Sequence, residues 1–393
     1  MTNRAVEIPR GTCRLFGTIK ALNTIKNTAI IVHGPKGCVY HINYILGLRG
    51  DRPSRVYSTS LDENDVIFGA EKKLINAIEE LDDEYHPDLI IVLSCCASSI
   101  IGEDVDSAVR HAKSKAKVIG IESGGFEGDF RTGYSETLKK LVEELTLPSK
   151  TKKSLAVNLV GMLRGGPDLR ELKRILSSIG VTVNAVLTAD ATLDQIQHVG
   201  AAALNIVLCE PSGKEAADIL EKKFGIPYII EDLPIGYSAT VRFLEHVGHA
   251  LGISLGAMDF KRNKEQTVVP IPYNSIAIIS GPTRAIAMTQ FLHELGINPR
   301  LVVIDFDSDL KSRLAEIVGP DCEILIEPEQ EEIIDQLKEK SIDLIIGGML
   351  ERPIAAMVGI DYLDIMHGSQ RTVGFEGADT LMDLLRSKRQ KIK

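Results

Sequence analysis

Residues 28–38 read TAIIVHGPKGC, and this stretch decides the fold. Its first five residues are β-branched or apolar without interruption, which is typical of a strand buried on both faces of a parallel sheet. Gly34 and Gly37 then permit a tight turn at the carboxyl end of that strand. Ligands of α/β sheets bind beyond this end of the strands, so Cys38 stands where binding chemistry is expected.

Similar apolar runs recur along the chain and alternate with amphipathic stretches. We predict strands at 28–32, 89–93, 117–121, 155–160, 181–186, 205–208, 275–279, 300–304 and 343–346. We predict helices at 15–23, 71–84, 105–116, 168–178, 214–224, 284–295 and 331–340. Alternation of this kind predicts an α/β protein built from doubly wound, Rossmann-like units with mostly parallel sheets.

Two polar, proline-containing breaks, at 147–153 and 261–272, divide the chain into segments of ordinary domain size. We therefore predict three domains. The first, 1–150, carries three cysteines of interest. The second, 151–266, carries Cys209, and the third, 267–393, ends in a C-terminal helix.

Composition excludes some classes of protein. The formal net charge is −9, which argues against general nucleic-acid binding, because that binding depends on neutralising phosphates. No apolar run approaches the roughly 20 residues that span a bilayer, and the first residues do not read as a signal peptide. We expect a cytoplasmic protein without a membrane partner, in which cysteines are core residues, metal ligands or reactive thiols.

Cys13, Cys38 and Cys96 each lie at or near the end of an apolar run. The chain has no Cys-x-x-Cys, so their spacing alone gives no metal signature, and as bare residues they read as buried hydrophobes. Their flanks favour ligation. Glycines in 34–37 let backbone amides approach a bound group, and IGED (101–104) predicts a turn into a helix with its acidic residues at the N-terminus.

Nucleotide-binding motifs are missing from the sequence. No Gly-x-Gly-x-x-Gly follows the first strand and no Walker A motif occurs, so any use of ATP would belong to a partner. Arg284 follows GPT (281–283) at a predicted helix start, a position suited to an anionic cofactor or substrate. A helix-surface salt bridge is the alternative for Arg284. Arg164 and His33 are further candidates for an anion contact.

Three motifs together resemble the nitrogenase component 1 superfamily. They are HGPKGC (33–38), TSLDENDVIFGAEKKL (59–74), and Cys96 with IGED (101–104). The likeness continues along the whole chain. This superfamily contains nitrogenase MoFe-protein subunits, their cofactor-assembly scaffolds, and nitrogenase-like reductases.

The resemblance implies roles for particular residues. Cys13, Cys38 and Cys96 match the three cysteines that hold an iron–sulfur cluster, of 4Fe-4S type, at a subunit interface. Their fourth ligand would come from a partner chain, with Cys95 as the local competitor. The resemblance matches Cys209 and His367 to residues that hold a second, complex iron–sulfur cofactor.

The implied function is that of a component 1 oxidoreductase. It would accept electrons from an ATP-dependent iron protein and reduce a substrate in an interdomain cavity. The alternatives are a non-catalytic scaffold for cofactor assembly and a degenerate homologue without redox work. Tyr134 or Ser135 stands where nitrogenases place a histidine, and the chain is short, which argues against a true nitrogenase. The chain would pair as a homodimer or with a paralogous component 1 subunit.

Overall fold

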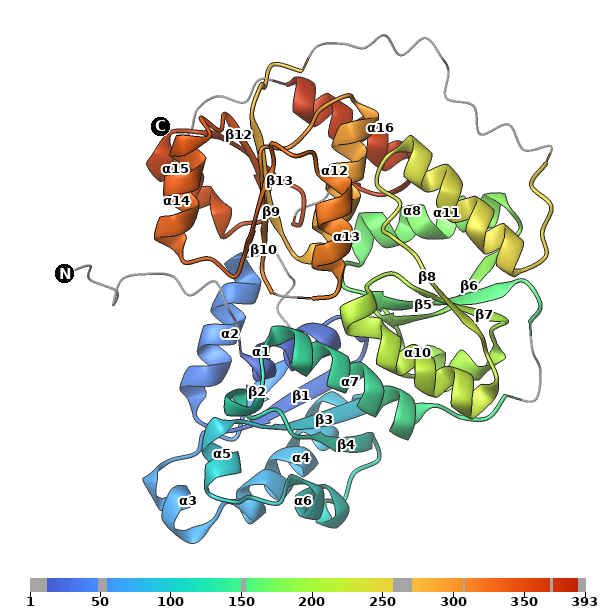
Figure 1. The fold of residues 1–393 in the computed structure, drawn as a ribbon. Coiled ribbons are helices and arrows are strands. Elements are labelled where there is room, and N and C mark those ends of the chain that lie inside the picture. The colour runs from blue at the N-terminus through green and yellow to red at the C-terminus, as the bar shows by residue number, and fades with distance from the viewer. Residues whose placement is uncertain are drawn as a thin grey trace. The chain divides into compact units, whose positions relative to one another are not determined.

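The computed structural model describes residues 13–48, 55–149, 153–256, 271–306, 308–367 and 370–387. They form an α/β fold with three sheets (Figure 1). Contacts within the chain define two compact units. The N-terminal unit comprises the described residues within 11–165 and 183–230, and the C-terminal unit those within 166–182 and 231–393. Three sheets agree with the predicted fold class; the three domain boundaries remain a prediction.

The first sheet of the N-terminal unit has the strand order β2-β1-β3-β4, and all its strands are parallel. Its strands are β1 Thr28–His33, β2 Val56–Ser58, β3 Leu89–Ser94 and β4 Lys117–Ile121. Every residue of β1 and β3 is buried, as their continuous apolar runs predict. Because His33 pairs with Ser94, both strands end at the same edge, and the segments carrying Cys38 and Cys96 leave from it.

Helices precede, connect and follow the strands of this sheet. They are α1 Arg14–Leu22, α2 Lys36–Leu48, α3 Glu63–Phe68, α4 Glu71–Tyr85, α5 Cys96–Ile100, α6 Val105–His111, the 3-10 turn η2 Gly125–Glu127, and α7 Phe130–Leu145. Helix α1 packs closely on α7 through two glycines. A Cβ on Gly17 would overlap the carbonyl oxygen of Phe130, and a Cβ on Gly133 would overlap that of Arg14. The lack of a side chain at these two positions therefore permits the helix crossing.

The second sheet, also in the N-terminal unit, has the order β6-β5-β7-β8. Its elements are β5 Ala156–Met162, β6 Thr182–Thr188, α9 Leu193–Gln197, η3 Val199–Ala201, β7 Leu204–Val207, α10 Glu210–Phe224 and β8 Tyr228–Ile230. A ladder of amide side chains crosses it. Asn158 donates to Asn205 at 2.8 Å and accepts from Asn184 at 3.0 Å. This ladder satisfies polar groups that would otherwise be buried without partners.

The C-terminal unit contains a five-stranded parallel sheet with the order β11-β10-β9-β12-β13. Its strands are β9 Ile276–Ser280, β10 Leu301–Ile304, β11 Glu323–Ile326, β12 Leu344–Gly347 and β13 Asp361–Asp364. Its helices are α8 Gly166–Ser178, α11 Tyr237–Ala250, α12 Pro282–Glu294, α13 Leu310–Ile317, α14 Gln330–Glu339, α15 Glu351–Val358 and α16 Gly374–Arg386. The predicted C-terminal helix is α16. No helix among the described residues has the length and apolarity to cross a membrane.

All nine predicted strands and all seven predicted helices are confirmed, with shifted ends in several cases. The prediction for 105–116 was too long, because α6 ends at His111. The Asp82 carboxylate accepts hydrogen bonds from the backbone amides of Lys115 and Ala116, at 2.6 and 3.2 Å, and holds that segment in a non-helical path. Residues 34–38 are also not simply a turn, since helix α2 begins at Lys36 and places Cys38 in its first turn.

Candidate functional site

The three candidate cysteines all lie at the beginnings of helices. Cys13 is the N-cap of α1, Cys38 lies in the first turn of α2, and Cys96 is the first residue of α5. Amide groups at helix N-termini carry partial positive charge and favour thiolates over thiols. The exposure of these residues differs: Cys13 is exposed, whereas Cys38 and Cys96 are half-buried. The cysteines are therefore accessible and set in a local field that suits anionic sulfur.

Gly125 brings Cys13 and Cys96 together. Its backbone amide donates a hydrogen bond to Cys96 Sγ at 3.1 Å. A Cβ built on Gly125 would lie 3.1 Å from both Cys96 Sγ and the Cβ of Cys13. Cys13 is also tied to this loop by an antiparallel bridge to Asp129. The glycine thus leaves room between two thiols that are far apart in the sequence.

Cys38 approaches the same group from the other side and makes its main contact with Cys95. The hydrogen bond to Cys95, burial, and the neighbouring Cys96 and Cys13 raise the pKa of Cys38 well above its ordinary range. The hydrogen bond from Cys38 lowers the pKa of Cys95 to about 5, with help from the amides of Ser98 and Ala97. Four sulfurs therefore interact electrostatically, and a proton is shared between Cys38 and Cys95.

Cys95 differs from the other three because only 1% of it is exposed. Its sulfur packs against Gly34, where a Cβ would overlap it. Cys96 instead sits beside the amide of Gly125 and is only half-buried. This difference in environment agrees with the expectation that Cys96 is the ligand, while the identity of the fourth ligand remains a prediction.

The donor set suits a multinuclear iron–sulfur cluster. Within the described part of the chain, no three His, Cys, Asp or Glu side chains converge in a way that would hold a single metal ion. A cluster spreads its thiolates over several irons, so its ligands stand farther apart than those of one ion. Three thiolates with nearby amide donors match the ligands and sulfur hydrogen bonds of such clusters. Cys13, Cys38 and Cys96 therefore fit the implied group.

Large apolar side chains are exposed on the elements that carry or follow these cysteines. They are Tyr40 on α2 (75% exposed), Ile67 and Phe68 on α3 (71% and 82%), Ile100 on α5 (72%) and Phe126 on η2 (77%). A single exposed apolar side chain needs no explanation, but several near one site mark an interaction surface. The cysteine site therefore lies in a part of the N-terminal unit suited to contact with another protein.

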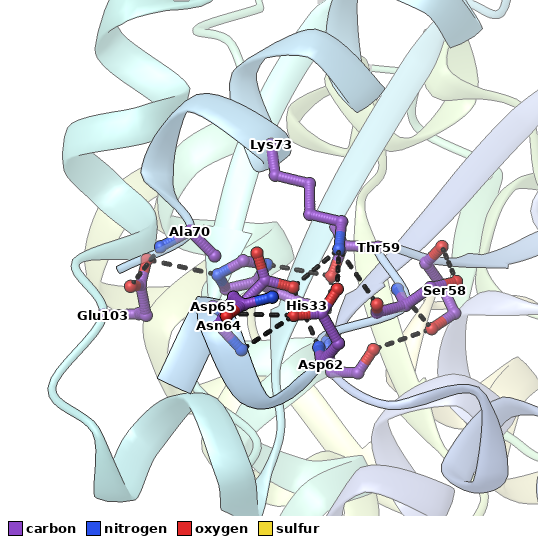
Figure 2. A network of polar contacts seen from close by, with 11 residues as sticks. His33, Ser58, Thr59, Asp62, Asn64, Asp65, Ala70, Lys73 and Glu103 are labelled. Carbon is purple, nitrogen blue, oxygen red and sulfur yellow. Dashed lines mark hydrogen bonds and ion pairs between the residues drawn. The ribbon is translucent and has the colours of Figure 1, made fainter. Parts of the chain in front are cut away.

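A polar network stands behind the cysteine segments (Figure 2). His33, at the end of β1, is fully buried, and both of its ring nitrogens have partners. Nδ1 lies 3.0 Å from Thr59 Oγ1, and Nε2 lies 3.3 Å from Glu103 Oε2. Burial lowers the pKa of His33, although Glu103 opposes this shift. His33 is thus a neutral structural residue, and the expected anion contact finds no support in its environment.

Glu103 plays a part that the sequence did not indicate. We expected it at the N-terminus of the following helix, but Asp104 caps α6 instead, through the amide of Ser107 at 2.7 Å. Glu103 accepts a hydrogen bond from the amide of Ala70 at 2.7 Å in addition to its contact with His33. Its distance in sequence from both partners explains why local patterns could not reveal it.

The same network continues into helix α3. Asp62 and Asp65 form a reciprocal capping box at its start. Lys73 bonds the Asp65 carboxylate at 2.6 Å and the carbonyl oxygen of Ser60 at 3.0 Å, as Figure 2 shows. The hydrogen bond from Lys73 lowers the pKa of Asp65, so this cap stays ionised. The motif at 59–74 thus builds a rigid support for the exposed Ile67 and Phe68.

Cys209 lies elsewhere in the N-terminal unit, at the N-cap of α10. It is buried, with 5% exposed, and its sulfur lies 3.3 Å from Ser212 Oγ. Gly161, at a φ of +72°, packs against it so closely that a Cβ would come within 3.1 Å of the Cys209 carbonyl oxygen. The first turn of a helix and a glycine that leaves space suit a thiolate ligand, but the burial also suits a core cysteine.

His367 lies in the C-terminal unit and is oriented by Asp364. Its Nδ1 is 3.3 Å from Asp364 Oδ2, and its backbone amide donates to Asp364 Oδ1 at 2.9 Å. Burial would raise the pKa of Asp364, but the hydrogen bonds from His367 outweigh it and lower the pKa. A carboxylate on one ring nitrogen typically prepares the other for a metal or substrate. Because Cys209 and His367 belong to different units, their shared cavity remains a prediction.

Arg284, in the first turn of α12, has its charge compensated within the C-terminal unit. It donates to Thr372 Oγ1 at 3.0 Å and to the carbonyl oxygen of Ile365 at 3.4 Å. The buried Asp168 carboxylate lies 3.9 Å from its guanidinium and also accepts from the amide of Thr372 at 2.7 Å. Arg284 therefore fixes the segment that contains His367. Direct contact with an anion remains a prediction.

Comparison with known proteins agrees with this site. The family described as nitrogenase component 1 type oxidoreductase matches residues 13–387. The nitrogenase iron-molybdenum cofactor biosynthesis protein NifE of Clostridium pasteurianum is 29% identical, over 93% of this chain and 84% of its own length. One of the polypeptides of the light-independent protochlorophyllide reductase of Synechococcus sp. is 28% identical, over 94% and 80%. A solved structure described as nitrogenase Cp1 at pH 6.5 has the same fold, with a TM-score of 0.85, 22% identity and coverage of 98% and 93%.

Proposed function

Because the chain belongs to the nitrogenase component 1 type oxidoreductases, we propose that it holds an interface iron–sulfur cluster through Cys13, Cys38 and Cys96. The observation that supports this most is the approach of Cys13 and Cys96 to Gly125, whose amide already donates to a sulfur. A cluster of 4Fe-4S type would supply one-electron redox chemistry. With three cysteines in the expected positions, the fourth ligand would come from a second subunit, either another copy or a paralogue.

We further propose that the protein is a scaffold on which an iron–sulfur cofactor is assembled. Sequence analysis placed a substrate-reducing role first and the scaffold second. The similarity to a cofactor biosynthesis protein over 93% of the chain favours the scaffold. Cys209 and His367 would hold the cofactor, and the buried Tyr134 stands where a nitrogenase places a histidine. The chain would then bind the cofactor without the residue that assists nitrogen reduction.

The exposed apolar side chains supply surfaces for the two partners that this function requires. Tyr40 and Phe126 lie on the elements that carry or adjoin Cys38 and Cys13, which suits the subunit that completes the site. Ile67 and Phe68 project from a helix fixed by a capping box, which suits a partner that binds and leaves, such as an ATP-dependent iron protein. Such residues commonly supply most of the binding energy at protein interfaces.

Cysteine variants test the cluster. Cys13→Ala, Cys38→Ala and Cys96→Ala should each lose bound iron, visible absorption and the EPR signal of the reduced protein after anaerobic purification. Cys322→Ala is the matched control, because Cys322 is half-buried in the C-terminal unit, outside this group. Unchanged iron content and EPR signal in the three variants would refute the cluster assignment.

Turnover separates the scaffold from the reductase, which the 28% identity to a protochlorophyllide reductase polypeptide supports as second candidate. A scaffold loaded with cofactor should activate an acceptor protein that lacks it, and Cys209→Ala should prevent loading. A reductase should consume a substrate in the presence of dithionite, ATP and the iron protein. Substrate turnover without cofactor transfer would overturn the scaffold proposal.

A further inference from the structure

One carboxylate, that of Glu103, joins three segments that surround the cysteine site (Figure 2). Glu103 lies on the turn between α5, which begins with Cys96, and α6. Its Oε2 contacts His33, directly before the turn that leads to Cys38, and its Oε1 accepts the amide of Ala70, directly after the α3 segment. Its side chain is only 11% exposed, so these contacts are shielded from solvent.

The hydrogen bonds of this group have a definite direction. A carboxylate only accepts, so the proton of neutral His33 must be on Nε2. Nδ1 then accepts from the Thr59 hydroxyl, whose oxygen in turn accepts the amide of Gly34 at 3.1 Å. Each donor in this chain has one acceptor, and reversal at any point would leave a buried group unsatisfied. The chain therefore connects the Gly34 turn to Glu103 as one unit.

Helix α3 depends on such anchors because it has no core of its own. All six of its residues are described and none is buried. Its start is fixed by Asp62, Asp65 and Lys73, and the chain leaving it is fixed where the Ala70 amide meets Glu103. A short helix without buried side chains is only marginally stable by itself. Its position therefore follows that of the groups that hold it.

We propose that Glu103 is a positioning residue that links the cysteine site to helix α3, so that occupancy of the site and the order of α3 depend on each other. This inference rests on the proposed function, because it requires a cluster at Cys38 and Cys96. Loading fixes the segments that begin at Gly34 and Cys96. Glu103 passes this constraint to Ala70, and hence to the exposed Ile67 and Phe68. Linkage requires the reverse as well: a partner that orders α3 favours the loaded site.

Two variants of Glu103 separate its two contacts. Glu103→Gln keeps the length of the side chain and an acceptor for Ala70, but presents an amide N–H to the protonated Nε2 of His33. Glu103→Ala removes both contacts. Asp104→Asn is the matched control, because it removes the adjacent carboxylate, which is exposed, and asparagine is an equally good helix N-cap.

Amide hydrogen exchange of the peptide spanning residues 59–74 provides the measurement, in apo protein and after anaerobic reconstitution with iron and sulfide. We expect loading to slow exchange over α3 and Ala70 in the wild type and in Asp104→Asn. Loading should have no such effect in Glu103→Gln, and Glu103→Ala should exchange faster in the apo form as well. Equal protection on loading in Glu103→Gln and the wild type, or no protection in the wild type, would overturn the inference.

Iron content distinguishes failure of this inference from failure of the proposed function. If the wild type takes up no more iron than Cys38→Ala, the cluster proposal falls and the inference falls with it. If the wild type takes up iron through its cysteines but α3 exchanges at the same rate before and after loading, only the role of Glu103 is refuted.

Discussion

The backbone amide of Gly125 lies 3.1 Å from Cys96 Sγ and donates a hydrogen bond to it. The two residues are 29 positions apart and follow neighbouring strands, β3 and β4, of one sheet. Gly125 also lies against Cys13, so that one glycine separates two candidate ligands. Its lack of a side chain is therefore as much a part of the site as the sulfurs are.

Gly125→Ala should lower iron occupancy without unfolding the protein. The new methyl group would lie 3.1 Å from Cys96 Sγ and 3.6 Å from Cys13 Sγ, in the space between the thiols. Iron content and the EPR spectrum of the reduced protein measure this. Gly37→Ala is the control, because it is next to Cys38 but a Cβ there meets nothing within 4 Å. Full occupancy in Gly125→Ala would show that this space is not needed.

Cys95→Ala should retain iron, in contrast to Cys96→Ala. Cys95 is 1% exposed and its sulfur packs against Gly34, away from the half-buried position of Cys96. Iron assays on both variants, with thermal unfolding measured in parallel, decide between the adjacent cysteines. Loss of iron from Cys95→Ala at unchanged thermal stability would identify it as a ligand.

Gly133→Ala should destabilise the N-terminal unit and disturb the cysteine site together. The methyl group would overlap the carbonyl oxygen of Arg14, the residue after Cys13, and would force α1 away from α7. Overpacking of this kind typically costs about 1–3 kcal/mol. Urea unfolding and iron content provide the measurements. Gly47→Ala, facing open space on α2, should instead be neutral or slightly stabilising, since alanine favours helix.

Asn158→Ala should destabilise the second sheet. It would remove the partner of Asn205 and Asn184 and leave the buried carbonyl oxygen of Val199 without its donor. Each unsatisfied buried group costs about 1–3 kcal/mol. Urea unfolding should show a clear loss, whereas the exposed Asn64→Ala should change the free energy of unfolding by about 0.5 kcal/mol or less. Equal effects of the two substitutions would contradict this role of the ladder.

His33 should make stability depend on pH. Burial lowers its pKa in the folded protein below the ordinary 6.5, despite the nearby Glu103, Cys95 and Asp65. The unfolded chain then binds a proton that the folded protein does not, so stability is full above pH 6.5 and falls as the pH decreases. Urea unfolding above and below this pH should show a smaller loss for His33→Gln than for the wild type. An identical pH dependence in both proteins would exclude His33 as its source.

The central strands could be predicted from the sequence, while four others could not. β1 and β3 are continuous apolar runs, because both of their faces are covered. The strands β2, β8, β11 and β13 are edge strands of three or four residues with partly exposed side chains, so they leave no clear pattern. Their positions follow from pairing with a neighbour, which local sequence does not encode.

The sequence by itself determined the α/β class, the mostly parallel sheets and the cysteines worth testing, because these follow from local periodicity and from motifs of adjacent residues. Only the tertiary structure decided which side chains meet. It placed Gly125 between Cys13 and Cys96, turned Cys95 into the core, and joined Glu103 to His33 across 70 residues. Such contacts depend on how strands and helices pack, and packing is a property of the whole chain.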